Sequence, residues 1–170
     1  MADAAVRRTV SGVIDRQLLT DRVYASRATA VSTPFHPKYY RLEQEKKVAL
    51  NTETAVKQLE DAGLIKDAEG YFGSEEQSVL RLLYNSENVY RLQTAEMIAQ
   101  QLESISLKLE LVGLPYADYM AALQEGEFDL YLGELAIDES MDISRLIEAG
   151  AGYGYGCLPE NAVQQVYTSY

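Results

Sequence analysis

The sequence is poor in several residue types, and each shortage excludes a class of protein. Cys157 is the only cysteine, so no disulfide can form within the chain. His36 is the only histidine, which excludes a metal site built from several histidines. The chain has 15 basic and 26 acidic residues, which give it a formal net charge of −11. This balance argues against a nucleic-acid partner, because phosphate binding needs a dense basic face.

Long apolar runs are also missing, because no stretch approaches the roughly 18 apolar residues that a membrane-spanning helix needs. The composition itself is that of a folded domain, since 47% of the 170 residues are hydrophobic and 24% are charged. No signal peptide precedes the first helix-like stretch, and residues 160–170 form another such stretch at the end. We therefore expect the chain to be a domain from a longer protein.

The first third of the chain predicts two helices separated by an irregular arm. Residues 3–19 carry apolar side chains at helical spacing. That stripe consists of Val6, Val10, Val13, Ile14 and Leu18. Prolines interrupt the pattern over residues 24–40. A second helix is predicted over residues 52–62, with its N-cap at Asn51 or Thr52 and a stop at Gly63.

The middle of the chain alternates strand and helix patterns. A short hairpin is predicted around residues 66–72. Strands are then predicted at residues 79–84, 106–112 and 128–132, with helices at 87–104 and 116–124 between them. Strands separated by helices of these lengths indicate βαβ units, in which a parallel sheet is flanked by helices on its faces. The predicted fold class is therefore α/β.

Polar side chains follow two of these strands. Asn85 and Ser86 come directly after the first, and the acidic residues Glu134, Asp138, Glu139 and Asp142 follow the third. Ligands of open α/β sheets bind beyond the carboxyl ends of the strands. We expect the acidic stretch to bind a positive group, and the amides near Asn85 to meet a carboxylate or peptide carbonyl. A solvated acidic loop, a calcium site and a glycosidase carboxylate pair are the alternatives, although the spacing does not match an EF-hand loop.

Three other features are better explained by structural roles than by catalysis or ligand binding. The glycine-rich residues 150–156 lack the Lys-Ser/Thr ending of a phosphate-binding loop. His36 lies between prolines in the irregular arm, which favours a packing or surface role over that of a catalytic base. Cys157 is interpreted as a small packing residue.

Five segments, in order, resemble family 5 extracellular solute-binding proteins, which serve peptide and nickel ABC transporters. The segments are VRRTVSGVIDR at residues 6–16, TPFHP at 33–37, AVKQLEDAG at 55–63, AEMIAQQL at 95–102 and GEFDLYLG at 126–133. The resemblance implies one lobe, the second, of a two-lobed periplasmic-binding-protein-like (type II) fold with a mixed sheet. It also implies that the first lobe is absent from residues 1–170.

The same resemblance implies a binding protein, with no enzymatic activity, cofactor or metal. Its partners would be a peptide or small solute, the first lobe and an ABC transporter permease, and its place the cell surface, as a lipoprotein. By position, Asp138 would receive a peptide amino terminus, while Glu134 stands where the family has a tryptophan. The full set of expected ligand-binding residues is Tyr131, Gly133, Glu134, Asp138, Asn85 and Ser86, and Tyr39 and Tyr40 are candidates for the same cleft face.

Two other functions fit the pattern of strands and helices. One is a small α/β hydrolase that uses Asp or Glu side chains, which would need a closed pocket within the 170 residues. The other is a regulatory module that senses peptides, because one fold can carry many functions.

Overall fold

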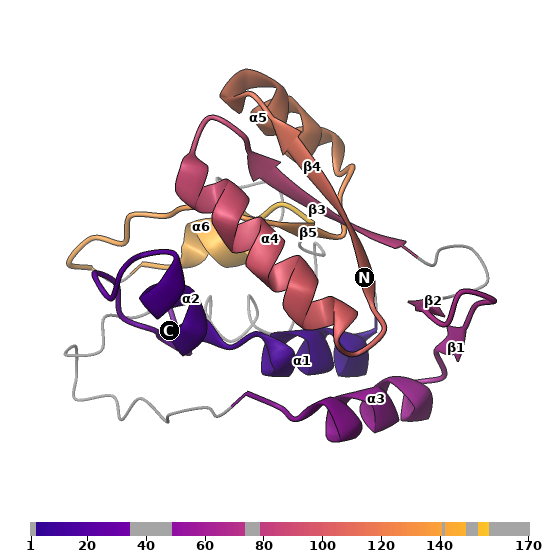
Figure 1. The fold of residues 1–170 in the computed structure, drawn as a ribbon. Helices are drawn as coiled ribbons and strands as arrows, with labels where there is room; N and C mark the ends of the chain where they lie inside the picture. The colour runs from indigo at the N-terminus through magenta and orange to yellow at the C-terminus, as the bar shows by residue number, and fades with distance from the viewer. Residues whose placement is uncertain (1–2, 35–48, 74–78, 141, 149–152, 157–170) are drawn as a thin grey trace.

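A computed structural model describes residues 3–34, 49–73, 79–140, 142–148 and 153–156 of the chain (Figure 1). Several features singled out from the sequence lie outside these ranges. They are His36, Tyr39, Tyr40, Cys157, residues 150–152 of the glycine-rich stretch and residues 160–170.

Three parallel strands form the centre of the fold. Strand β3 (Val79–Asn85) lies between β4 (Lys108–Leu114) and β5 (Leu130–Tyr131), with Leu82 in register with Leu111 and Leu130. Helix α4 (Val89–Glu103) connects β3 to β4, and α5 (Tyr116–Glu125) connects β4 to β5. The prediction of an α/β fold with βαβ units and a parallel sheet is thus confirmed.

The sheet is covered on both faces. Neighbouring residues of β3 point to opposite faces, so one strand contributes to both cores. Leu82 and Tyr84 belong to the main core, together with buried residues of α1, α3 and α4. Leu83, between them, packs against Tyr119 and Leu123 of α5. Figure 1 shows α4 crossing in front of the sheet, with α1 and α3 below it. The result is a three-layer arrangement.

The prediction of one long first helix is wrong, because two shorter helices occupy this region. Helix α1 (Ala4–Val13) ends at Ile14, and α2 (Arg16–Arg22) begins after Asp15, whose backbone is extended. The Asp15 side chain accepts a hydrogen bond from the Leu18 amide, which makes it the N-cap of a new helix. The change of direction leaves Leu18 exposed and buries Leu19.

Helix α4 begins later than predicted. Its N-cap is Asn88, whose side chain accepts hydrogen bonds from the amides of Tyr90 and Arg91, so neither Asn85 nor Ser86 caps the helix. Val89 therefore stands in the first turn, where 57% of it is exposed. Further along the helix, Ala95, Ile98 and Leu102 are buried in the main core.

The remaining elements lie around this centre. Helix α3 (Thr52–Asp61) begins at the N-cap Asn51 and packs against α1. Strands β1 (Ile65–Lys66) and β2 (Phe72–Gly73) form the predicted hairpin as a separate antiparallel pair, with Gly70 in its turn at φ +88°. Parallel and antiparallel pairs thus lie in different sheets among the described residues, and the short helix α6 (Ser144–Ile147) follows the acidic stretch.

Candidate functional site

The carboxyl ends of all three parallel strands lie at one edge of the sheet, because Asn85, Leu114 and Tyr131 are their last residues. All six predicted site residues lie at or after the ends of β3 and β5. The structure brings three of them, Tyr131, Gly133 and Glu134, together around a cavity of about 240 Å³. Its other lining residues are Leu135, Leu146 and Tyr153. We call this the edge cavity.

Aromatic rings form one wall of the edge cavity. Tyr131 makes edge-to-face contacts with Phe128 and Tyr155, with ring centres 5.2 and 5.9 Å apart. Its hydroxyl donates a hydrogen bond of 3.0 Å to the carbonyl of Tyr153. A Cβ atom at Gly133 would lie 2.7 Å from the Tyr131 ring, so only glycine lets the chain leave the strand this close to the ring. The Tyr131 ring is therefore fixed by contacts with two other rings and by its own hydrogen bond.

Arg91, which the sequence analysis missed, fixes the segment after β5. From the first turn of α4 it donates hydrogen bonds to the carbonyl of Gly133 at 2.6 Å and to the carboxylate of Glu134 at 2.5 Å. The Arg91 side chain is only 16% exposed, whereas that of Glu134 is 79% exposed. Charge-assisted hydrogen bonds of this kind are stronger than neutral ones. Glu134 is therefore a partly neutralised carboxylate at the rim of the edge cavity.

Tyr119 of α5 holds the neighbouring carbonyl and was also missed. Its hydroxyl donates a hydrogen bond of 2.9 Å to the carbonyl of Leu132, and only 5% of the residue is exposed. Burial raises the pKa of Tyr119 to about 12, although the positive charge on Arg91 acts to lower it. Side chains from two helices thus hold two consecutive carbonyls where the chain leaves the sheet.

Asp138 and the acidic residues around it lie further along this segment. Asp138 accepts hydrogen bonds from the amide and hydroxyl of Ser140, at 2.9 and 2.5 Å, and Asp142 accepts one from the amide of Ser144. The Asp138 side chain is exposed, and no basic side chain of the described residues forms an ion pair with it. Its charge is therefore available to a ligand.

Asn85 and Ser86 lie at the same edge, in the turn that leads to α4. The Ser86 amide donates to the carbonyl of Leu114 at 2.8 Å, and the Asn85 side chain accepts from the amide of Glu87 at 3.0 Å. Both residues thus have partners within the protein, which shape the turn. Contact of Asn85 or Ser86 with a ligand remains a prediction.

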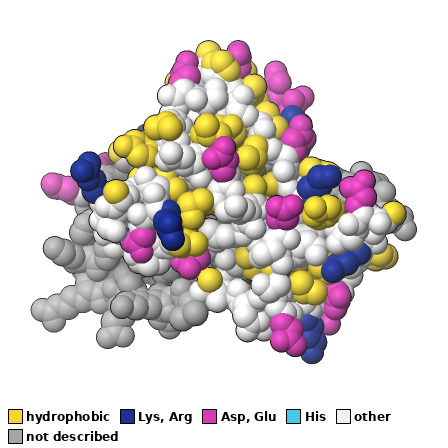
Figure 2. All heavy atoms as spheres, in the orientation of Figure 1, with side chains coloured by type: hydrophobic (Ala, Val, Ile, Leu, Met, Phe, Trp, Pro, Cys, Tyr) yellow, Lys and Arg dark blue, Asp and Glu magenta, His cyan; other side chains and the backbone are white. Residues whose placement is uncertain are grey.

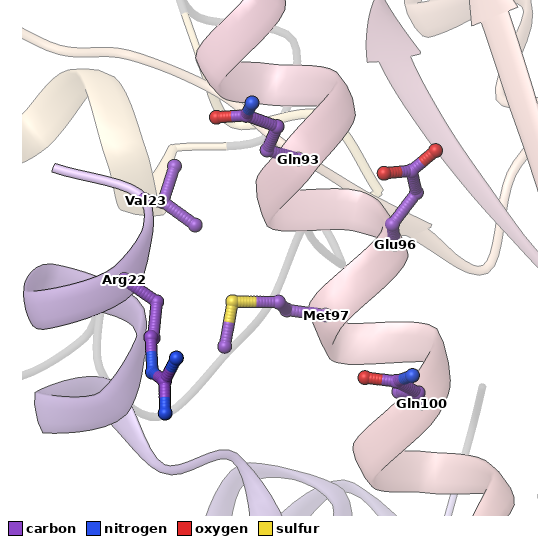
Figure 3. A pocket seen from close by; sticks show the side chains of 6 residues that line it. All are labelled: Arg22, Val23, Gln93, Glu96, Met97 and Gln100. Atoms are coloured by element: carbon purple, nitrogen blue, oxygen red, sulfur yellow. The ribbon is translucent and has the colours of Figure 1, made fainter.

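A larger hollow of about 440 Å³ lies away from the edge cavity, between α2 and α4 (Figure 3). Arg22 and Met97 extend into the space between the helices in this view. The other lining residues are Val23, Gln93, Glu96 and Gln100, and of the six only Val23 is buried. We favour the edge cavity as the functional site, because its walls are fixed by hydrogen bonds and it lies at the strand ends.

The described part of the chain shows no group of side chains arranged for a metal ion, and the face seen in Figure 2 is not basic. Within it, no three His, Cys, Asp or Glu side chains gather closely enough to hold a metal ion. Figure 2 shows Lys and Arg side chains placed singly among Asp and Glu on the visible face. Each helix in the described ranges is too short or too polar to cross a membrane.

Comparison with known proteins finds one family model that covers most of the chain. The family model described as bacterial extracellular solute-binding proteins, family 5 Middle, matches residues 1–154. No curated protein is similar enough in sequence to match the chain.

Solved structures share the fold at low sequence identity. The oligopeptide-binding protein AppA from Bacillus subtilis, in complex with a nonapeptide, has a TM-score of 0.84 at 17% identity, with 98% of this chain and 35% of that one covered. NikZ from Campylobacter jejuni, in complex with Ni(L-His), has a TM-score of 0.81 at 16% identity, with the same coverage. A nickel ABC transporter structure from Bacillus halodurans has a TM-score of 0.82 at 15% identity, with 99% and 36% covered. The chain thus spans about a third of their length.

Proposed function

Because the chain belongs to the family 5 bacterial extracellular solute-binding proteins, we propose that it is a ligand-binding lobe that delivers peptides or a related small solute to an ABC importer. The observation that carries this proposal is the edge cavity. It lies at the carboxyl ends of parallel strands, where α/β folds bind ligands, and its walls combine tyrosine rings, joined by a hydrogen bond, with leucine side chains.

The chain would act as one lobe of a two-lobed protein. This is supported by the fold comparison. Nearly all of this chain aligns with the solved structures, but the aligned part is only about a third of each of them. A second lobe would close over the carboxyl edge by a hinge motion and complete the site. The permease of an importer would be the membrane partner, and the protein would work outside the cell, attached as a lipoprotein.

Within this lobe, Asp138 is the group that would receive a peptide amino terminus. Its carboxylate is exposed and has no basic partner among the described residues, whereas Glu134 is already paired with Arg91. Tyr131 and Gly133 would contact the solute from the wall of the edge cavity. Asn85 and Ser86 would contact it from the neighbouring turn.

Binding without catalysis fits this geometry better than hydrolysis does. A hydrolase that uses two carboxyl groups needs one of them protonated in an apolar pocket. Glu134, Asp138 and Glu139 are all exposed, and Glu134 is held in an ion pair. We therefore propose that the protein is not an enzyme.

The proposal is tested by NMR titration of this chain with mixtures of tripeptides and tetrapeptides. One lobe offers about half of the contacts of a two-sided clamp, so we expect affinities weaker than micromolar, which NMR can still detect. Amide signals of Tyr131, Gly133 and Leu135 are expected to shift. Absence of any shift, or shifts confined to residues around the hollow between α2 and α4, would contradict the proposal.

A further inference from the structure

Most of the edge cavity is lined by apolar surface. The rings of Tyr131 and Tyr153 and the side chains of Leu135 and Leu146 form its walls. The Tyr131 hydroxyl is engaged with the Tyr153 carbonyl, and the guanidinium of Arg145 lies 5.1 Å from the centre of the Tyr153 ring. Because these contacts already fix the walls, a ligand group would enter a formed apolar site.

Among the described residues that line the edge cavity, Glu134 is the one with a carboxylate, and its charge is already compensated. Glu134 forms its ion pair with Arg91, which also donates to the carbonyl of Gly133 and is itself largely buried. A cationic ligand group would have to compete with Arg91 for Glu134, and it would be repelled by the same guanidinium. The pair therefore removes the attraction that the carboxylate alone would offer to a cation.

We propose that the edge cavity receives an uncharged, apolar side chain of the solute, and that Arg91 sets this preference by neutralising Glu134. This inference rests on the proposed function in solute binding. The volume is adequate, since an apolar cavity of about 150 Å³ holds benzene and the edge cavity measures about 240 Å³. A phenyl ring or a branched aliphatic group fits this space.

The test compares three tripeptides, Ala-Phe-Ala, Ala-Leu-Ala and Ala-Lys-Ala, by NMR titration of the wild-type chain. Burial of an apolar side chain contributes enough for a preference of about tenfold or more over lysine. We expect Ala-Phe-Ala and Ala-Leu-Ala to bind more tightly by this factor. The largest amide shifts should occur at Leu135, Leu146 and Tyr153.

Variants of the ion pair test the role of Arg91. The R91Q substitution frees Glu134, so Ala-Lys-Ala is expected to bind severalfold more tightly and the preference for Ala-Phe-Ala to fall. The E134Q variant keeps Arg91 and removes the carboxylate, and it is expected to weaken Ala-Lys-Ala binding further. R81Q is the matched control, because Arg81 also faces a glutamate, Glu110 at 3.8 Å, but lies on β3 away from the cavity lining.

The outcomes separate this inference from the proposed function. If wild type binds Ala-Lys-Ala as tightly as Ala-Phe-Ala, or if R91Q and E134Q keep the preference of R81Q, the inference is overturned while solute binding stands. If none of the three tripeptides shifts any signal, both are overturned. L146W, which fills the edge cavity, is expected to lower Ala-Phe-Ala affinity, and unchanged affinity would place the side chain elsewhere.

Discussion

Tyr119 and Leu132 join α5 to the end of the sheet through one partly buried hydrogen bond of 2.9 Å, from the phenol hydroxyl to the backbone carbonyl. Strand β5 has only two residues, so few ladder hydrogen bonds hold the segment that follows it. Tyr119 and Arg91 supply the missing partners from the helices, at Leu132 and Gly133. The position of the edge cavity thus depends on side chains that lie outside the strand.

Tyr119 is expected to make the protein less stable in alkaline solution. Burial raises its pKa from 10.0 to about 12, so the folded state favours the neutral phenol. The contribution of the neutral phenol to the unfolding free energy is complete below pH 10 and falls as the pH rises from about 10 to about 12. The loss is at most about 2 to 3 kcal/mol, since one pKa unit corresponds to about 1.4 kcal/mol. Urea unfolding of wild type and Y119F between pH 8 and pH 12 measures this.

The Y119F variant serves as the control in that experiment. It cannot ionise at this position, so its unfolding free energy is expected to fall less steeply between pH 10 and pH 12. It should also be less stable than wild type at pH 8 by about 1 kcal/mol, because the Leu132 carbonyl loses its donor. Equal slopes for the two proteins would contradict the assigned pKa.

Gly113 is expected to tolerate no side chain while Tyr84 is present. The two residues are paired across β3 and β4, and a Cβ atom at position 113 would lie 2.5 Å from the hydroxyl oxygen of Tyr84. G113A is therefore expected to cost about 1 to 3 kcal/mol in unfolding free energy. The cost should shrink in a Y84L background, and a double-mutant cycle measured by urea unfolding gives the coupling. Additive effects would show that the two positions do not conflict.

Asn88 is expected to stabilise the turn that carries Arg91. It caps α4 by accepting hydrogen bonds from the amides of Tyr90 and Arg91. N88A is expected to lower the unfolding free energy by about 1 kcal/mol, whereas N88D keeps an acceptor and costs less. Thermal unfolding of both variants measures the difference, and equal losses would mean that the cap hydrogen bonds contribute little.

Asp138 is expected to matter for solutes that carry a free amine. Replacement by Asn keeps an oxygen that can accept from Ser140, so the loop geometry is retained while the charge is lost. D138N is expected to weaken binding of a free-amine tripeptide severalfold and to leave its N-acetylated form unchanged. NMR titration with both peptides measures this, and unchanged binding of both would remove Asp138 from the site.

Residues close together in the sequence made much of the fold predictable. The apolar run before Asn85 and the alternation of Leu107, Leu109 and Leu111 identified the two long strands, because a strand's side chains alternate between faces. The break between α1 and α2 was missed because apolar residues continue through it at helical spacing. Only the cap formed by Asp15 ends one helix and starts the next.

The candidate site was predictable only in part. Its place at the strand ends followed from the order of strands and helices, and Tyr131, Gly133 and Glu134 lie together around the edge cavity there, while their contact with a ligand stays a prediction. The partners of these residues were not predictable, because Arg91 lies 43 positions before Glu134 and belongs to another element.

The sequence by itself determined most of the strand and helix segments and the family resemblance, since periodicity and short motifs are local properties. The tertiary structure decided which carboxylates at this edge of the sheet form an ion pair within the protein and which do not. Strand β5 pairs with β3 through Leu83 and Tyr131, and the first turn of α4 brings Arg91 against the segment that follows. That contact engages Glu134 and leaves Asp138 free of a basic partner among the described residues, because an ion pair depends on distance in space and not along the chain.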